Sequence, residues 1–275
     1  MNRVSIRQTS SKHSIDERNQ TALSHLLSTL PQKIKVIWFD TIDSTNRFAK
    51  TYFSCAEFNQ NQLYVFIANS QSAGRGQSNR HWLSPPGNIY LTLLAPLKKP
   101  IAGRLSLECA FSVAKIPLLK KANIKVKWPN DLYLDANSTD LKVGGILIEP
   151  CDTHVIVGVG LNIQPMTLPE DSRNAAGHIP LNVSGEKIHL IYEIVCELWN
   201  ACKLFELGSV DLPLRFRHVD MLYQHRLMNL DNPQQVIGIG KGINADGAYI
   251  TEYNGTIQTH FHGTLRRFIP REAPK

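Results

Sequence analysis

A glycine-rich loop with two arginines carries the first chemical signal in this sequence. Gly74 and Gly76 flank Arg75, and Arg80 and Trp82 follow within the stretch QSAGRGQSNRHW. Glycine lets the backbone adopt positive φ and bring its N–H groups close to a ligand, while arginine presents a cationic fork to an anion. The pattern favours an anion-binding loop, although an ordinary hairpin loop uses the same residue types.

Three further stretches offer polar and charged groups. DSTN at 43–46 places two hydroxyls where a strand turns into a helix, KWPND at 127–131 ends a strand with an amide and a carboxylate, and Lys142 precedes Gly144 and Gly145. Hydroxyls both donate and accept hydrogen bonds, and a carboxylate suits Mg²⁺ shared with phosphate oxygens. Each stretch alone also fits a helix N-cap, a plain turn or a solvated lysine.

Gly158 and Gly160 are spaced by two within VIVGVGL, and therefore lie on one face of a strand. The missing side chains leave room there for a flat ligand, or for a close contact with another element. With the cations, this set suits activation of a carboxylate by ATP. The acid attacks the α-phosphate, pyrophosphate leaves, and the protein aligns the reactants and neutralises charge. The candidates for this work are Arg75, Arg80, Lys127, Lys142 and a metal at Asp131.

Composition narrows the class of protein. The 275 residues are 43% hydrophobic and 19% charged, which is typical of a globular chain and argues against disorder or a coiled coil. The net charge of +7 suits an anionic partner such as nucleic acid or nucleotide phosphate. Five scattered cysteines without a Cys-x-x-Cys pair argue against a zinc site and favour the cytoplasm. No apolar run reaches the roughly 18 residues of a membrane span, so we expect no membrane association.

The periodicity of apolar residues predicts the elements that must position these groups. Three regions are expected: an N-terminal extension at 1–34, partly disordered; a main unit at 35–225; and a small β module at 226–275 with turns at Asp246-Gly247 and Asn254-Gly255. The expected helices are 21–30, one after the DSTN turn, 105–122 broken at Pro117, 186–207 and 212–222. The expected strands are 35–39, 64–68, 88–97, one from Lys125 that runs into Trp128-Pro129, 141–150 and 153–163, with a long loop at 164–182.

The motifs together resemble those of biotin protein ligases. DSTN at 43–46, GRG with a following Trp at 74–82, KWPND at 127–131, KVGGILIE at 142–149 and GVGLN at 158–162 occur in that family's order and spacing. The resemblance covers about residues 36–165, and the module after 226 resembles the family's C-terminal domain. It implies an α+β fold with a mixed, largely antiparallel sheet flanked by helices, like class II aminoacyl-tRNA synthetases, and a small SH3-like β-barrel.

The resemblance also implies an activity and roles for residues. ATP and Mg²⁺ would convert biotin to biotinyl-5′-AMP, and a lysine of a biotin carboxyl carrier protein domain would accept the biotinyl group. The implied catalytic residues are Arg75, Lys142 and Asp131, with Asp131 also the metal ligand. The implied biotin site is Ser44, Thr45, Gln71, Gly74, Arg75, Lys142, Gly145 and Gly158. The implied nucleotide site is Arg75, Arg80, Trp82, Lys127, Asn130, Asp131, Lys142 and Asn162, covered by the segment 164–178.

Two departures from the family pattern are visible. The loop usually continues Arg-Arg-Gly, whereas this chain has Gln77-Ser78-Asn79, which lowers its charge; Asn79 can still adopt the left-handed conformation. The roughly 35 residues before the sheet are too few for a winged helix, so we expect a ligase without repressor activity and without DNA as a partner.

Other interpretations of the sequence remain open. A lipoate or octanoate ligase of the same fold shares the adenylation chemistry, a basic nucleic-acid-binding protein would use the net charge, and a degenerate ligase would only bind. An exposed sheet edge would make a homodimer plausible.

Overall fold

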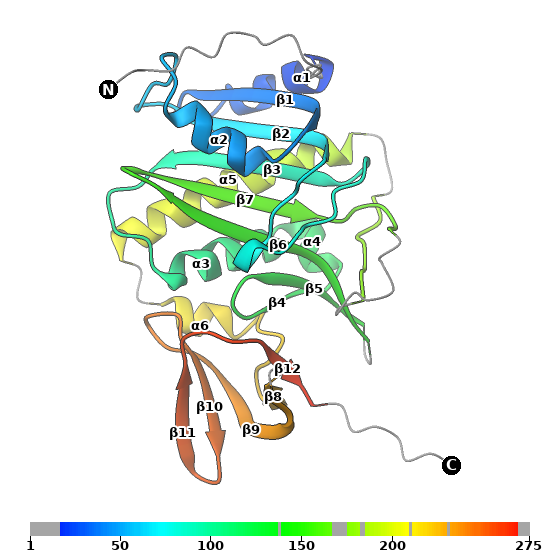
Figure 1. Ribbon diagram of the computed structural model, residues 1–275, viewed down its shortest axis with the longest axis vertical. Helices are drawn as coiled ribbons and strands as arrows, with labels where there is room; N and C mark the ends of the chain where they lie inside the picture. Colours follow the sequence, from blue (N-terminus) through cyan, green and yellow to red (C-terminus); the bar gives the residue numbers. More distant parts are fainter. Residues whose placement is uncertain are drawn as a thin grey trace.

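A seven-stranded sheet forms the centre of the larger part of the molecule (Figure 1). The computed structural model describes residues 17–136, 139–166, 175–181, 185–208, 211–229 and 232–268. Among the described strands only β1 and β2 pair in parallel, and the other neighbours are antiparallel. In spatial order the strands are β1 (Ile34–Ile42), β2 (Leu63–Gln71), β3 (Ile89–Pro96), β7 (His154–Leu161), β6 (Thr139–Cys151), β5 (Asp131–Ala136) and β4 (Ile124–Lys127). The mixed α+β class with a largely antiparallel sheet is confirmed.

Helices cover both faces of this sheet, because successive side chains of a strand point to opposite faces. On β2, Val65 and Ile67 join the core beneath α1 (Glu17–Leu27), α3 (Gly103–Ala114) and α5 (Glu186–Leu207). Tyr64 and Phe66 of the same strand pack on the other face against Tyr52 of α2 (Thr45–Phe53). The second face carries the single short helix α2 among the described elements that contact it, which leaves part of that face free.

Local signals explain where several helices begin and end. Ser44 is the N-cap of α2, and its hydroxyl accepts a hydrogen bond from the backbone N–H of Arg47. The expected break at Pro117 is confirmed, since α3 ends at Ala114 and Pro117 opens α4 (Pro117–Lys121), where its missing N–H does no harm. The first described helix differs from the expected 21–30: it begins at Glu17 and ends at Leu27, and a turn separates it from Pro31.

Strand β1 extends beyond the expected 35–39. It continues to Ile42 because Thr41 and Ile42 still pair with Ser70 and Gln71 at the end of β2. On its other edge, the backbone N–H of Trp38 donates to Oε1 of Gln20 from α1 at 3.0 Å. Helix α1 therefore satisfies one backbone group at this edge of the sheet.

The C-terminal region forms a separate five-stranded antiparallel sheet in the order β11-β10-β9-β8-β12 (Figure 1). Its hairpin turn at Asn254-Gly255 has positive φ at both residues, and Gly247 has φ 86°, so both expected turns are confirmed. Closure into an SH3-like barrel stays a prediction. The strands are β8 (Arg226–Asn229), β9 (Asn232–Ile243), β10 (Tyr249–Tyr253), β11 (Thr256–His260) and β12 (Leu265–Arg267).

The expected helix at 212–222 is wrong in its second half. Helix α6 (Leu212–Phe216) stops early because the chain then joins the outer edge of β4, where Val126 bonds the backbones of Val219 and Met221 at 2.7 and 3.0 Å. Asp220 between them is buried, and its carboxylate accepts from the hydroxyl of Tyr249 in β10. This junction joins the small sheet to the edge of the large one.

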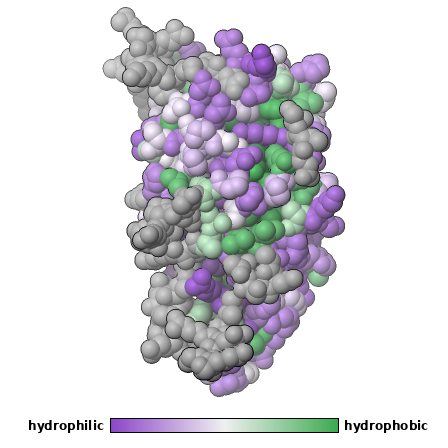
Figure 2. Space-filling view, turned by 90° about the vertical axis from the view of Figure 1, so that its right-hand side faces the viewer, coloured by the Kyte–Doolittle hydropathy of each residue, from purple (hydrophilic) through white to green (hydrophobic). Residues whose placement is uncertain are grey.

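The surface is uneven in polarity. Figure 2 shows the side of the molecule that lies to the right in Figure 1, where apolar side chains gather in the middle of the face between hydrophilic ones. Among the described helices, none combines the length and the apolar character that crossing a bilayer requires.

Candidate active site

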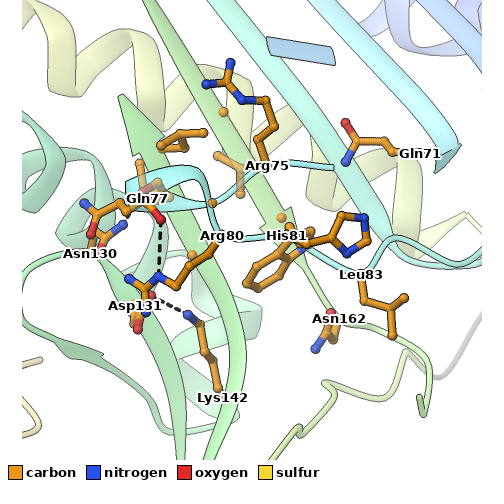
Figure 3. A pocket seen from close by; sticks show the side chains of 18 of the residues that line it. Gln71, Arg75, Gln77, Arg80, His81, Leu83, Asn130, Asp131, Lys142 and Asn162 are labelled. Carbon is orange, nitrogen blue, oxygen red and sulfur yellow. Dashed lines mark hydrogen bonds and ion pairs between the residues drawn. The ribbon is translucent and has the colours of Figure 1, made fainter. Parts of the chain in front are cut away.

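A cavity of about 550 Å³ opens beside α2, on the face of the large sheet that α2 leaves partly free (Figure 3). Its walls come from the start of α2, the loop between β2 and β3, and strands β5, β6 and β7. Of the residues predicted for the site, the cavity is lined by Ser44, Thr45, Gln71, Arg75, Arg80, Trp82, Asn130, Asp131, Lys142, Gly145, Gly158 and Asn162.

The sheet register builds the floor of this cavity. Asp131 on β5 pairs with Gly145 on β6, and Gly145 pairs with Gly160 on β7, so the three residues lie in one row across the sheet. The indole of Trp82 covers this row, because a Cβ added at Gly160 would lie 2.6 Å from its Nε1. The side chain of Asn46 similarly covers Gly158. The room expected above the two strand glycines is thus filled by side chains of the chain itself.

The loop between β2 and β3 closes one wall of the cavity. The carbonyl of Gly74 accepts from the backbone N–H of Trp82 at 2.9 Å, and the N–H of Gly76 donates to the carbonyl of Arg80 at 2.7 Å. A Cβ at Gly74 would overlap Ser84 and the backbone of Trp82, so this glycine permits a close approach of the two limbs and does not line the cavity. The loop residue in the left-handed conformation is Ser78, with φ 54°, and not Asn79 as expected.

A polar cluster lies at one end of the cavity. Oε1 of Gln71 accepts from the backbone N–H of Thr45 at 2.9 Å, and its Nε2 donates to Oγ of Ser84 at the same distance. Ser44 and Thr45 are buried, and both line the cavity. The structure therefore brings together Ser44, Thr45 and Gln71, three of the side chains of the implied biotin site.

Each principal cation of the site pairs with a carboxylate of the same sheet. Nζ of Lys142 lies 2.7 Å from Oδ1 of Asp131 and 5.2 Å from the ring centroid of Trp82. A guanidinium nitrogen of Arg75 lies 3.1 Å from Oε1 of Glu149. Figure 3 shows that the guanidinium of Arg75 is directed away from the pair formed by Lys142 and Asp131.

A β-bulge aims Lys142 into the cavity. Leu132 pairs with Gly144, but the next residue, Tyr133, pairs with Lys142, so β6 contains one extra residue at Val143. Val143 is fully buried in the core on the opposite face. Strict alternation from Gly145 would place the side chain of Lys142 on that core face, and the bulge returns it to the cavity.

Two buried polar atoms of the cavity lack a hydrogen-bond partner among the described residues. They are Nε1 of Trp82, which can only donate, and Oδ1 of Asn162, which can only accept. The other atoms of the Asn162 amide are engaged, since Nδ2 donates to the carbonyl of Gly177 at 3.1 Å. Buried polar groups usually find partners, so these two atoms are suited to a polar ligand.

Two residues that were predicted to contact the nucleotide, Asn130 and Lys127, also make contacts within the protein. The side-chain amide of Asn130 donates to the carbonyl of Ile146 and ties the corner to β6. Lys127 does not line the cavity; it is 5% exposed, and its Nζ lies 5.1 Å from the ring centroid of Tyr133. Burial lowers the pKa of the Lys127 ammonium to about 8, against the opposing effect of Asp131.

Sequence reasoning missed several residues of the site. Asn46 was quoted as part of DSTN without a role, and Glu149 ended the motif at 142–149 in the same way. Period-two alternation from Gly145 does place Glu149 on the cavity face, and this signal could have found it. Glu149 lies behind the lining; the lining residues without a predicted role include Asn46, His81, Leu83, Leu91, Leu147, Met166, Ala175 and Ala176. Residues 167–174 of the predicted covering segment lie outside the described residues.

Within the described residues, no group of three histidine, cysteine or acidic side chains could hold a metal ion. Asp131 supplies one carboxylate to the cavity. Mg²⁺ commonly binds through one or two carboxylates together with substrate phosphates, so this donor fits a metal that arrives with a nucleotide.

The chain has clear relatives. A model of the biotin/lipoate A/B protein ligase family matches residues 38–162. The bifunctional ligase/repressor BirA of Escherichia coli is 31% identical over 212 residues, which cover 72% of this chain and 64% of BirA. The biotin--[acetyl-CoA-carboxylase] ligase of Paracoccus denitrificans is 33% identical over 46% of this chain and 54% of its own length. The chain thus spans less than two thirds of the length of these relatives.

Solved structures share the fold. The biotin protein ligase from Aquifex aeolicus in complex with biotin and ATP matches with a TM-score of 0.68 and 24% identity, over 87% of this chain and all of that one. The biotin protein ligase from Leishmania major with biotinyl-5-AMP matches with a TM-score of 0.52 and 24% identity, over 84% and 99%. Residues 38–162, which supply most of the cavity described above, form the part of the chain that matches the biotin/lipoate A/B protein ligase family.

Proposed function

We propose that the protein activates biotin with ATP and transfers the biotinyl group to a lysine of a biotin carboxyl carrier protein domain. In the first step a carboxylate oxygen of biotin bonds to the α-phosphorus, the bond to the β-phosphate breaks, and pyrophosphate leaves. In the second step the lysine amine bonds to the acyl carbon of biotinyl-5′-AMP, AMP leaves, and the amine loses its proton.

The observation that carries the proposal is the arrangement of charge and polarity in one cavity. Ser44, Thr45 and Gln71 form a neutral hydrogen-bonding cluster in its lining. Figure 3 shows Gln71 on one side of the cavity and Lys142 on another. The cluster suits the uncharged ureido head, whereas Lys142 and Arg75 suit the carboxylate and the α-phosphate. Because the carboxylate is itself the nucleophile, these cations need only align the reactants and stabilise the charge that develops on phosphate oxygens.

Other features support the nucleotide half of the site. The unpaired atoms, Nε1 of Trp82 and Oδ1 of Asn162, offer one donor and one acceptor to adenine or ribose. Arg80 and Asn130 add polar groups to the same wall. Mg²⁺ bound to the phosphates and to Asp131 would neutralise part of their charge. Lys127, which lies behind this wall, would act on the phosphates at longer range.

We place the protein in the cytoplasm, where biotin, ATP and carrier domains meet, and we propose a carrier domain of acetyl-CoA carboxylase as its macromolecular partner. A homodimer through a sheet edge would use a surface other than the edge of β1 near Trp38, since Gln20 occupies that position. Analytical ultracentrifugation would decide the state of assembly.

The test is ATP–pyrophosphate exchange driven by biotin, lipoate or octanoate, with Lys142→Ala beside the unmodified protein. Exchange with biotin alone, lost in the variant, is the expected result. Lys115→Ala is a matched control, because Lys115 pairs with Glu197 at the surface of the helical layer, at 2.9 Å. Exchange with lipoate or octanoate in place of biotin would move the activity to the lipoate branch of the family. Transfer is then measured with a carrier domain and its lysine-to-arginine variant.

A further inference from the structure

A series of buried and partly buried hydrogen bonds runs from Thr92 through Asn46 and Glu149 and ends at Arg75. The amide Nδ2 of Asn46 donates to Oε2 of Glu149 at 2.7 Å, and the guanidinium of Arg75 donates to the other oxygen, Oε1, at 3.1 Å. Oδ1 of Asn46 accepts from the hydroxyl of Thr92 at 2.7 Å. Thr92 is fully buried, and Asn46 is 4% exposed.

Only one assignment of donors and acceptors is possible in this series of hydrogen bonds. A carboxylate only accepts hydrogen bonds, so Glu149 requires the NH₂ group of the Asn46 amide and thereby fixes its orientation. The amide oxygen then faces Thr92, which must give its proton. Thr92 also lies 2.8 Å from the hydroxyl of Thr45 at the polar end of the cavity. The Asn46 amide, itself held by Thr92, therefore anchors Glu149 through the carboxylate oxygen that Arg75 does not use.

The anchored carboxylate determines where Arg75 lies. An arginine side chain loses rotational freedom about several bonds when it is held in one position. The side chain of Arg75 is 32% exposed on a loop, so it could adopt other rotamers without Glu149. Glu149 engages one guanidinium nitrogen, and a guanidinium carries five N–H donors, so further donors stay available for an anion. A carboxylate fastened to Asn46 cannot follow Arg75 if the arginine moves away.

We infer that Glu149 is a positioning residue for Arg75, and that Asn46 and Thr92 act through Glu149 by fixing its carboxylate. The inference rests on the proposed function, because it assigns Arg75 to the carboxylate and phosphate of the reacting acid. The series of hydrogen bonds also joins the two ends of the cavity: Thr45 meets the uncharged head of the substrate, and Arg75 meets its charged end.

A double-mutant cycle in pyrophosphate exchange tests this inference. Glu149→Gln keeps the size of the side chain but removes the charge that holds Arg75, and Glu149→Ala removes both. We expect either substitution, made alone, to lower kcat/KM for ATP at least tenfold. In an Arg75→Ala background the same changes should lower it less than twofold, since the residue on which Glu149 acts is gone.

Controls separate positioning from folding. Glu252→Gln removes the partner of Lys241 in the five-stranded sheet, an ion pair at 2.7 Å, and should leave kcat/KM unchanged. Glu149→Asp, with a shorter carboxylate, should recover part of the loss. If Glu149 only stabilised the fold, the variants would lower the melting temperature and the active fraction equally in both backgrounds, which would overturn the inference.

Two other outcomes are decisive. A rise in kcat/KM in Glu149→Gln would show that Glu149 competes with the substrate for Arg75, and would also overturn the inference. Absence of exchange in the unmodified protein, with any acid, would instead refute the proposed function and remove the basis for this inference.

Discussion

Gly158→Ala offers a direct test of how tightly the cavity wall is packed. Gly158 is not at positive φ, so an alanine there meets no backbone strain. Its Cβ would overlap Oδ1 of Asn46 and lie 2.9 Å from Cγ and 3.0 Å from Nδ2 of the same side chain. The amide of Asn46 would have to move, and its hydrogen bonds to Thr92 and to the Glu149 carboxylate would be lost.

The magnitude follows from those two bonds. A neutral hydrogen bond contributes about 1 kcal/mol to stability, and one to a charged group about 1.5–3 kcal/mol. Replacing glycine restricts the unfolded chain and returns about 0.4–1 kcal/mol. We therefore expect Gly158→Ala to lower the free energy of unfolding by about 2–3 kcal/mol, measured by urea denaturation at constant pH.

The background and the control make the test specific. In an Asn46→Ala protein the obstructing amide is absent, so Gly158→Ala should be neutral or should raise the free energy of unfolding by up to about 1 kcal/mol. Gly103→Ala should be neutral or slightly stabilising, because an added Cβ there meets nothing within 4 Å. An equal loss in both backgrounds would refute the reasoning, and so would a stable Gly158→Ala protein that has lost only its activity, since the glycine would then serve the ligand alone.

Three further predictions concern charge. Burial lowers the pKa of Lys127 to about 8, so its positive charge is lost as pH rises above 8. The KM for ATP, measured by pyrophosphate exchange, should therefore rise over that range in the unmodified protein. Lys127→Arg should abolish this rise, because arginine keeps its charge. Burial raises the pKa of Asp220 from 3.8 to about 7, so the unfolded chain releases this proton at lower pH than the folded one, and stability falls as pH rises from about 4 to 7. Asp220→Asn should remove on the order of 2 kcal/mol of the difference in unfolding free energy between pH 5 and pH 8, and an unchanged slope would contradict this. Arg267 pairs with Asp135 and Asp140 between the small sheet and the large one, so Arg267→Met should lower the melting temperature, while Arg266→Met, at the exposed neighbouring position, should not.

Much of the fold followed from local patterns. Alternation located the strands, Pro117 marked the break between α3 and α4, and Asn254-Gly255 formed the expected turn. The wrong ends of β1 and α6 share one cause, which is pairing with distant segments. Strand β1 continues to Ile42 because β2 continues beside it. Helix α6 stops because the residues after it pair with β4, and the bond from Lys125 to His218 shows that these segments lie 93 positions apart in the sequence.

The site shows the same division. The motifs predicted many of the residues that line the cavity. The sequence alone did not distinguish residues that line the cavity from residues that only support its walls. Gly74 and Lys127 were assigned to ligands, yet Gly74 allows two loop limbs to approach and Lys127 lies behind the wall. Both roles depend on packing between segments that are far apart in sequence.

By itself, the sequence determined which residue types could meet an acid and a nucleotide, since glycine spacing, hydroxyls and cations are local properties of the chain. It also determined the alternation that puts Gly145 and Glu149 on one face of β6. Only the tertiary structure decided that Lys142 shares this face, because one extra residue at Val143 shifts the register against β5. Only the tertiary structure, likewise, placed Asn46 against Glu149 and Glu149 against Arg75, since hydrogen bonds between residues 74 or 103 positions apart are set by the path of the chain and not by its local pattern.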